Sequence, residues 1–323
     1  MRYFSAEYFE KLSNICCQYV LDNYDYCYLT AMHTKNRLIG AQTIIAGMSY
    51  SRNGIVDTKL VDTINFSSSS QDLYYDFQHI KKAVGEGKQQ IKTCIINIGY
   101  YALYWDLSCS KNESWKIKKT HYPILGMAHH YQVVEEQDMM QNVVYDKSIF
   151  QGNWLREFVC EWTEGFFQDE STYYGSLKTR ENDNPFGLEK IIWHTLPEDT
   201  KRRIAIQKAN DHNRLKVHEH TRQENENLMR EMTEYLFQHQ ITPVFLILPF
   251  TAYYNDHINK EYKKGIVSLL EELPYPVELL DMNDYLDIFD DSDFLDPEHL
   301  NLSGALKATE LLNEFLNFIA DEK

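Results

Sequence analysis

The sequence predicts an α/β protein, a flavodoxin-like three-layer sandwich with a mainly parallel five-stranded sheet and a mostly helical insertion. Two observations support this prediction. Short apolar runs alternate along the chain with longer segments whose apolar residues recur at helical spacing. Most of these runs are apolar throughout and do not alternate with polar residues, which is typical of parallel strands covered on both faces.

The five predicted strands are short, rich in β-branched residues or Leu, and bounded by polar or turn residues. They cover Thr43–Gly47, Leu60–Phe66, Thr93–Gly99, Pro243–Pro249 and Val277–Asp281. Helices are predicted over Ser70–Val84, Asn210–Gln240, Ile258–Leu273 and Ser303–Ala320. Ser303 is the expected N-cap of the last helix. Right-handed crossovers between the strands would give a doubly wound sheet.

Two segments fall outside this alternation. Residues 1–38 are expected to form an N-terminal helical extension, with one helix over Glu7–Tyr24 and a connector. Residues 39–106 and 206–323 form the predicted core. Residues 107–205 hold four of the five Trp and are too long for a structureless loop. They are expected to form a mostly helical insertion or cap that packs near the site.

Composition excludes several classes of protein. The formal net charge of −16 disfavours binding to nucleic acids and to anionic membrane surfaces. No window approaches the roughly 20 apolar residues of a membrane span, and the N-terminus lacks the apolar core of a secretory signal. We therefore expect a cytoplasmic protein without a membrane span.

No cofactor or metal is expected. The first strand–helix turn is Gly47-Met-Ser-Tyr-Ser51, not a Gly-rich phosphate loop, and no CxxC pair occurs. His212, His218 and His220 lie on the long charged helix, where solvated histidines are the expected interpretation. His129-His130 in the insertion could line a pocket, although a structural role is the default.

The first chemical signal is Ser49, which directly follows the first predicted strand. In an open α/β sheet, ligands bind beyond the carboxyl ends of the strands, so this serine is well placed. Its backbone N–H would lie at the start of the next helix, where an anion is favoured. An ordinary helix cap would explain the same serine. Arg52 and Asn53 follow it and could bind a substrate carboxylate or phosphate, or serve only the turn.

The second signal is Asp296-Pro-Glu-His299-Leu-Asn, directly before the last helix. A carboxylate and an imidazole three residues apart can share one turn, with Asp296 accepting the Nδ1 proton and turning Nε2 toward a nucleophile. An acidic surface loop is the alternative, since six Asp residues lie between 281 and 293. That alternative does not explain His-Leu-Asn followed by Gly-Ala at the helix start.

Together these segments resemble the first and last sequence blocks of SGNH (GDSL-like) hydrolases. The intermediate blocks also have counterparts, and the whole resemblance covers roughly residues 40–106 and 240–320. Asn65 followed by small residues resembles the second block, and Asn97-Ile-Gly-Tyr-Tyr101 resembles the third. Two short motifs resemble one branch of this family, which is related to the D-alanyl transfer protein of teichoic-acid synthesis and to cell-surface polysaccharide proteins. These motifs are Ser70-x-Asp-Leu-Tyr-Tyr75 and Gly99-Tyr-Tyr101.

The resemblance implies a Ser49–His299–Asp296 triad and an oxyanion hole, a set of donors for the negative oxygen of the transition state. Ser70 stands where the family has its oxyanion glycine, and its backbone N–H would serve beside that of Ser49. Tyr101 stands where the family has an asparagine. Loss of such a donor costs ~10²–10³ in rate. The hydroxyl of Tyr100 or Tyr101, or the side chain of Asn65, could replace it.

The expected function is that of a serine esterase or O-acyltransferase, acting through an acyl-enzyme on an acylated saccharide or cell-surface glycan precursor. The sequence leaves hydrolysis or transfer, the acyl group, the acceptor and the oligomeric state open. A non-catalytic polysaccharide-assembly or binding protein that kept the fold is the alternative. A nucleotide-dependent transferase is the weakest interpretation, because the Gly-rich loop is missing.

Overall fold

The computed structural model describes residues 23–88, 90–132 and 193–321 and divides the chain into two compact units. One unit comprises residues 1–35 and 108–187, and the other comprises residues 36–107 and 188–323. In the first unit, the described elements include most of α2 (Tyr24–Leu38), the π-helix η4 (Ile117–His121) and α5 (Tyr122–Leu125). The second unit contains the sheet and the residues of the candidate active site.

The sheet of the second unit has five parallel strands in the order β2-β1-β3-β4-β5. Their bounds are Thr43–Gly47 for β1, Thr63–Asn65 for β2, Thr93–Asn97 for β3, Thr242–Ile247 for β4 and Glu278–Asp281 for β5. The predicted α/β fold class is confirmed, and within the described residues every strand pair is parallel. All five carboxyl ends therefore lie along one edge of the sheet.

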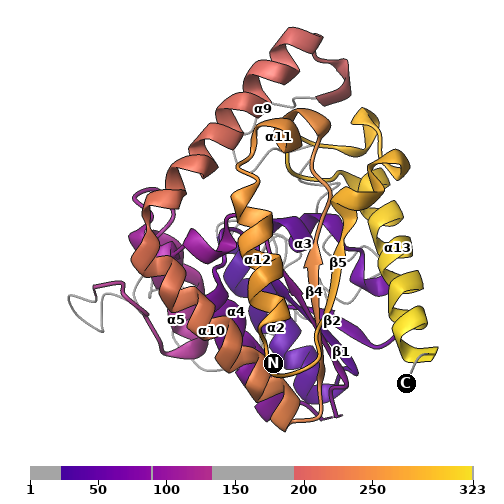
Figure 1. The fold of residues 1–323 in the computed structure, drawn as a ribbon. Coiled ribbons are helices and arrows are strands. Elements are labelled where there is room, and N and C mark those ends of the chain that lie inside the picture. The colour runs from indigo at the N-terminus through magenta and orange to yellow at the C-terminus, as the bar shows by residue number, and fades with distance from the viewer. Residues whose placement is uncertain (1–22, 89, 133–192, 322–323) are drawn as a thin grey trace, which may run out of the picture. The chain divides into compact units, whose positions relative to one another are not determined.

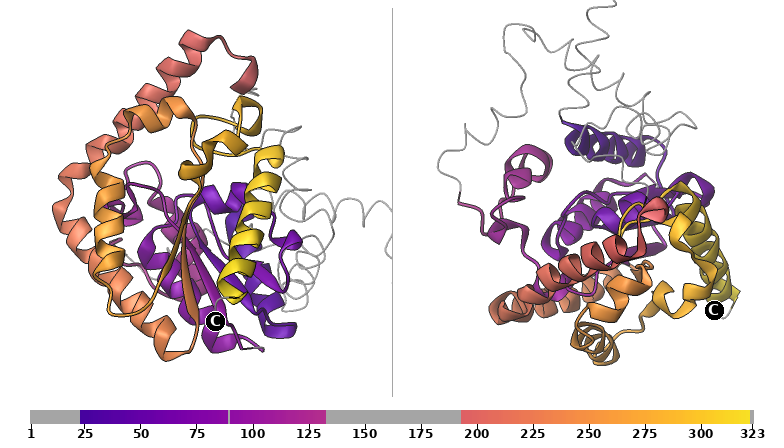
Figure 2. Two further views of the ribbon diagram at one scale, coloured as in Figure 1. Left: turned by 45° about the vertical axis from the view of Figure 1, so that its right-hand side comes forward. Right: turned by 90° about the horizontal axis from the view of Figure 1, so that it is seen from above.

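Both faces of the sheet are covered by helices (Figure 1). After β2, β3 and β4 the chain crosses in one direction, through α4 (Leu73–Glu86), α10 (Glu219–Gln238) and α12 (Glu261–Glu271). Right-handed crossovers place these helices on one face, where α4 packs on α10. The crossover from β1 to β2 runs the other way, and α3 (Ser49–Gly54) packs there against α13 (Leu302–Asp321). Figure 2 shows α13 on the side of the sheet opposite α10 and α12.

Burial explains why the strands are apolar throughout. Ile44, Ile45 and Ala46 of β1 are fully buried, as are Val244, Phe245 and Leu246 of β4. Neighbouring residues of a strand point to opposite faces, so both faces of the sheet must be covered. Each buried large apolar side chain contributes about 1.5–3 kcal/mol relative to an exposed one.

The charged segment expected as one helix over Asn210–Gln240 is interrupted. The helix α9 (Glu198–Asn213) ends first, and η6 (Arg214–Val217) separates it from α10. Tertiary hydrogen bonds account for the break. The Tyr262 hydroxyl donates to the carbonyl of His212, and Asn213 Oδ1 accepts the backbone N–H of Asn259 at 2.7 Å. These contacts bind the last turn of α9 to the segment before α12.

Other boundaries also differ from the predictions. Residues 25–38, expected as a connector, form most of α2, in which Cys27, Tyr28, Ala31 and Met32 are buried at helical spacing. The expected helix over Glu7–Tyr24 lies almost entirely outside the described residues. Ser303 is not the N-cap of α13, because Asn301 Oδ1 accepts the backbone N–H of Gly304 while the Ser303 hydroxyl donates to Asp293.

Most of the expected insertion over 107–205 lies outside the described residues. Its last part, with η5 (Trp193–Thr195) and α9, belongs to the unit that contains the sheet. There α9 packs against α11 (Ala252–His257), at the carboxyl edge of the strands. None of the helices in the described ranges is long and apolar enough to cross a membrane.

Candidate active site

Ser49 lies at a sharp turn between β1 and α3. Met48 is extended, with φ −90° and ψ −165°, and the helix begins at the next residue. The turn packs closely on β3, since a Cβ added to Gly47 would lie 2.7 Å from both Cβ and the carbonyl oxygen of Asn97. Asn97 Oδ1 also accepts the backbone N–H of Ser51 at 3.0 Å. Glycine at 47 and asparagine at 97 thus fix the position of the serine.

Asp296 and His299 share the loop that precedes α13. Asp296 Oδ1 accepts the backbone N–H groups of Glu298 at 2.8 Å and His299 at 2.9 Å, which closes the loop over three residues. The backbone N–H of Leu295 donates to the carbonyl of His299 at 2.8 Å. The loop conformation therefore follows from local hydrogen bonds, as the three-residue spacing led us to expect.

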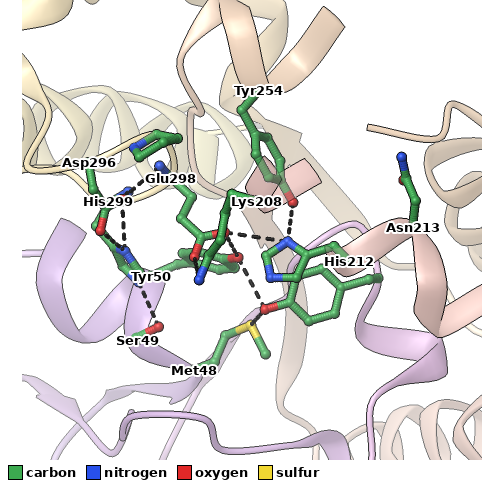
Figure 3. A network of polar contacts seen from close by, with 12 residues as sticks. Met48, Ser49, Tyr50, Lys208, His212, Asn213, Tyr254, Asp296, Glu298 and His299 are labelled. Atoms are coloured by element: carbon green, nitrogen blue, oxygen red, sulfur yellow. Dashed lines mark hydrogen bonds and ion pairs between the residues drawn. The ribbon is translucent and has the colours of Figure 1, made fainter. Parts of the chain in front are cut away.

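The three predicted residues lie in a hydrogen-bonded row (Figure 3). Ser49 Oγ is 2.8 Å from His299 Nε2, although the two residues are 250 positions apart in the chain. His299 Nδ1 is 2.9 Å from Asp296 Oδ2 and 3.1 Å from Oδ1. Because the carboxylate can only accept, Nδ1 carries the proton and Nε2 is left to accept the proton of Ser49. This is the arrangement of a nucleophile, a base and the group that orients the base.

Electrostatics favour the ionised form of Asp296 and the protonated form of His299. Burial opposes the charge of Asp296, but the neighbouring His299 and the backbone hydrogen bond from Glu298 lower its pKa to about 2. Burial lowers the pKa of His299, but the Asp296 carboxylate has the larger effect. The pKa of His299 is therefore raised above that of an ordinary histidine. Asp296 is therefore ionised at neutral pH, and it favours the imidazolium that forms when His299 takes up a proton.

A second polar network adjoins this row, and the sequence analysis did not anticipate it. Its centre is Glu298, whose side chain is 3% exposed. Glu298 Oε2 accepts the Tyr50 hydroxyl at 3.0 Å and lies 3.4 Å from His212 Nδ1, and Oε1 is 2.9 Å from Lys208 Nζ. The Tyr254 hydroxyl lies 2.6 Å from the same His212 nitrogen.

The interpretation of His212 as a solvated histidine is wrong. Its side chain is 12% exposed and its ring packs against that of Tyr101, with the centroids 4.0 Å apart and the planes tilted by 33°. Burial lowers its pKa to about 4, so it is neutral at physiological pH. His218 and His220, in contrast, are exposed as expected. A sequence signal existed, because Lys201, Ala205, Lys208, Ala209 and His212 share one helical face on which the two alanines are buried.

The structure assigns the protons of the two tyrosines suggested as oxyanion donors. The Tyr100 hydroxyl donates to Asp281 at 3.1 Å. The Tyr50 proton goes to Glu298, so the Tyr101 proton goes either to the Tyr50 oxygen at 3.2 Å or to Met48 Sδ at 3.9 Å. Each tyrosine has a single hydroxyl proton. Both of these protons are therefore engaged away from Ser49.

Of the other expected oxyanion residues, Asn65 is hydrogen-bonded to the backbone of neighbouring segments, whereas Ser70 is distinguished by its backbone conformation. Asn65, at the end of β2, donates its side-chain amide to the carbonyl of Ser51 at 3.0 Å and accepts the backbone N–H of Ser67 at 2.9 Å. It holds the turn after Ser49. Ser70 has a left-handed backbone with φ +62°, a conformation that favours glycine. This is the position where the resembled family carries glycine. The Ser70 carbonyl accepts the indole N–H of Trp105 at 3.0 Å.

The two expected substrate-binding residues lie in α3, the helix that starts at Ser49. Arg52 is buried, with 5% of its surface exposed, and Asn53 is half-buried. Their suggested role in binding a substrate carboxylate or phosphate stays a prediction.

Comparison with known proteins adds little to this picture. No family model matches the chain, and no curated protein sequence matches it. One solved structure, described as "a putative platelet activating factor from Streptococcus pneumonia", aligns with a TM-score of 0.42 and 10% sequence identity over 97% of this chain and 100% of that chain. A likeness at this level does not indicate an activity.

Proposed function

We propose that the chain is a serine-dependent acyl-ester hydrolase or O-acyltransferase of the SGNH type. The observation that carries the proposal is the continuous row from Ser49 Oγ through His299 to Asp296, with contacts of 2.8 and 2.9 Å. A surface serine that merely caps a helix has no need of an imidazole held by an ionised carboxylate. A nucleophile, a base and a group that orients the base, in this order, are the parts of a serine triad.

In the proposed mechanism, Ser49 Oγ attacks the carbonyl carbon of an ester while His299 Nε2 takes the serine proton. The imidazolium forms beside Asp296, which is ionised and stabilises it. His299 then gives the proton to the leaving alkoxide, and an acyl-enzyme remains on Ser49. In the second half, His299 deprotonates a water or an acceptor hydroxyl, whose oxygen attacks the acyl carbon. The bond to Ser49 Oγ then breaks, and His299 returns the proton to that oxygen. Water yields hydrolysis, and a second alcohol yields transfer.

Negative charge on the carbonyl oxygen requires donors that are already aimed at it. The backbone N–H groups of Ser49 and Ser70 are the proposed donors. The left-handed backbone at Ser70 supports its half of this assignment, because such a conformation turns an N–H in a direction that regular backbone does not offer. With the protons of Tyr100 and Tyr101 engaged elsewhere, we propose a two-donor oxyanion hole and hence slow chemistry on simple esters.

The proposed substrate is an acyl group carried by a saccharide or glycan precursor. Two segments support this part of the proposal, because both resemble the cell-surface polysaccharide branch. They are residues 65–72 and Gly99-Tyr-Tyr101. Binding energy from the remote parts of a large substrate could offset the weak oxyanion hole.

The direct test is covalent labelling with a fluorophosphonate, which reacts with activated serines. Wild-type protein should be labelled at Ser49, as located by peptide mass spectrometry, and Ser49→Ala should not be labelled. Ser51→Ala is the matched control, because its hydroxyl lies 2.6 Å from that of Ser67 and belongs to the same helix as Ser49. If the wild-type protein is not labelled by the fluorophosphonate, the proposed function is refuted.

The engaged tyrosine and asparagine side chains favour one alternative, a non-catalytic polysaccharide-assembly or binding protein that kept this fold. In that case wild type and Ser49→Ala would bind glycan fragments equally well and neither would be labelled.

A further inference from the structure

Two residues that flank the proposed triad are joined to each other. Tyr50 follows the nucleophile and Glu298 precedes the base, and the Tyr50 hydroxyl donates to Glu298 Oε2 at 3.0 Å. This contact runs beside the 2.8 Å contact between Ser49 and His299. The Tyr50 ring also packs on the His299 ring, with centroids 5.2 Å apart. The segments that carry the nucleophile and the base are thus connected twice.

The carboxylate in this second connection is buried, and a buried charge is costly unless it is paired and hydrogen-bonded. Its ion-pair partner is Lys208, which reaches it from α9 with a contact of 2.9 Å. The Lys208 side chain is 44% exposed whereas that of Glu298 is 3% exposed, so the lysine lies between the buried carboxylate and solvent. In Figure 3, Lys208 and Glu298 lie between the Ser49–His299 pair and His212.

We propose that Glu298 is a positioning residue that clamps the nucleophile segment to the base segment through Tyr50, with Lys208 of α9 as its counterion. This inference rests on the proposed function, because it assigns a role around the same Ser49–His299 pair. It makes α9 part of the active site, although α9 supplies no member of the triad.

The clamp has an electrostatic consequence that a purely structural contact would lack. The charged groups that face His299 are Asp296 and Glu298, which raise its pKa, and Lys208, which lowers it. The other titratable neighbours are Tyr50 from α3, Tyr101 beside β3, Tyr254 from α11 and His212 from α9. Burial raises the pKa of each tyrosine and lowers that of His212 to about 4, so all four are neutral at physiological pH. Among the residues that the structure describes, Glu298 and Lys208 are the charged groups that act on the Asp296–His299 pair.

Three substitutions separate the clamp from the charge. Tyr50→Phe removes the hydrogen bond but no charge. It should lower the fluorophosphonate labelling rate of Ser49 about tenfold or more, as misplaced catalytic groups do, without moving the pH midpoint of labelling. Glu298→Gln removes the negative charge, so the midpoint should move to lower pH. Lys208→Met removes the positive charge, so the midpoint should move to higher pH, and the double variant Glu298→Gln/Lys208→Met should return it toward that of wild type.

Lys201→Met is the matched control, because Lys201 lies on the same face of α9 but pairs with Asp291 at 2.5 Å. Loss of the Lys201–Asp291 ion pair should leave the pH midpoint of labelling equal to that of wild type. Melting temperatures of all variants check that each one is folded. A Tyr50→Phe variant labelled at the wild-type rate, or midpoints of Glu298→Gln and Lys208→Met that move in the same direction, would overturn the inference.

A second readout does not depend on activity. The pKa of His299 can be followed by NMR of the imidazole, with its signal assigned by its loss in His299→Gln. The expected order of pKa is Glu298→Gln below wild type and wild type below Lys208→Met. If wild type is not labelled while this order holds, the proposed function fails and the charge effect of Glu298 and Lys208 on His299 stands. If labelling works and the order is absent, only the inference fails.

Discussion

Replacement of Asp296 by Asn tests the proposed triad more sharply than removal of the nucleophile, because its effect follows from the hydrogen bonds. Asp296 Oδ1 accepts two backbone N–H groups, at 2.8 and 2.9 Å, and both of its oxygens face His299 Nδ1. In the variant, the remaining oxygen satisfies the backbone donors, so the new amide NH₂ faces Nδ1. An NH₂ group can only donate. His299 must then accept at Nδ1 and carry its proton on Nε2, where it can no longer take the proton of Ser49.

The expected loss is therefore that of a base in the wrong tautomer, ~10³–10⁴ in rate, about 4–5.5 kcal/mol of barrier. Residual activity should remain, because the nucleophile and backbone donors are intact. The assay is the rate of fluorophosphonate labelling at pH 8, together with turnover of a short-chain aryl ester.

Asp291→Asn provides the matched control, since Asp291 lies in the same loop and pairs with Lys201. It should be labelled at close to the wild-type rate. If Asp296→Asn were labelled within about tenfold of wild type, Asp296 would not orient the base, and the tautomer argument would be refuted.

Three further outcomes are expected. The labelling rate of the wild type should fall as the pH drops through the pKa of His299, because protonated His299 cannot accept a proton. A pH series of the labelling rate should place the midpoint above the pKa of an ordinary histidine, because Asp296 raises the pKa of His299. Tyr100→Phe should leave acyl-enzyme formation unchanged, because its hydroxyl donates to Asp281, and a large loss in stopped-flow acylation would show that the oxyanion hole has a third donor. Gly47→Ala should destabilise the fold by about 1–3 kcal/mol in urea unfolding, because its Cβ would press on Asn97 at 2.7 Å, whereas Gly85→Ala in α4, whose Cβ meets nothing within 4 Å, should not destabilise it.

Local signals in the sequence account for much of the fold and for one half of the site. Thr43–Gly47 was predicted with the bounds that β1 has, because a buried parallel strand must be apolar on both faces. The pairing of Asp296 with His299 was predictable for a similar reason. Three residues of separation allow a carboxylate to accept both the backbone N–H and the ring N–H of the histidine, and no distant part of the chain is needed.

Only the tertiary structure could decide the contacts between distant segments. Ser49 follows β1 and His299 lies in the segment after β5, and they meet because the parallel strands all end at one edge of the sheet. Lys208 and His212 lie in α9, a charged helix whose sequence is typical of a solvent-exposed one. The loop that carries Glu298 contacts one face of this helix and shields it from solvent. The tyrosine hydroxyls depended on the fold as well. A side chain has one proton to donate, and which acceptor receives it depends on neighbours that packing alone brings within reach.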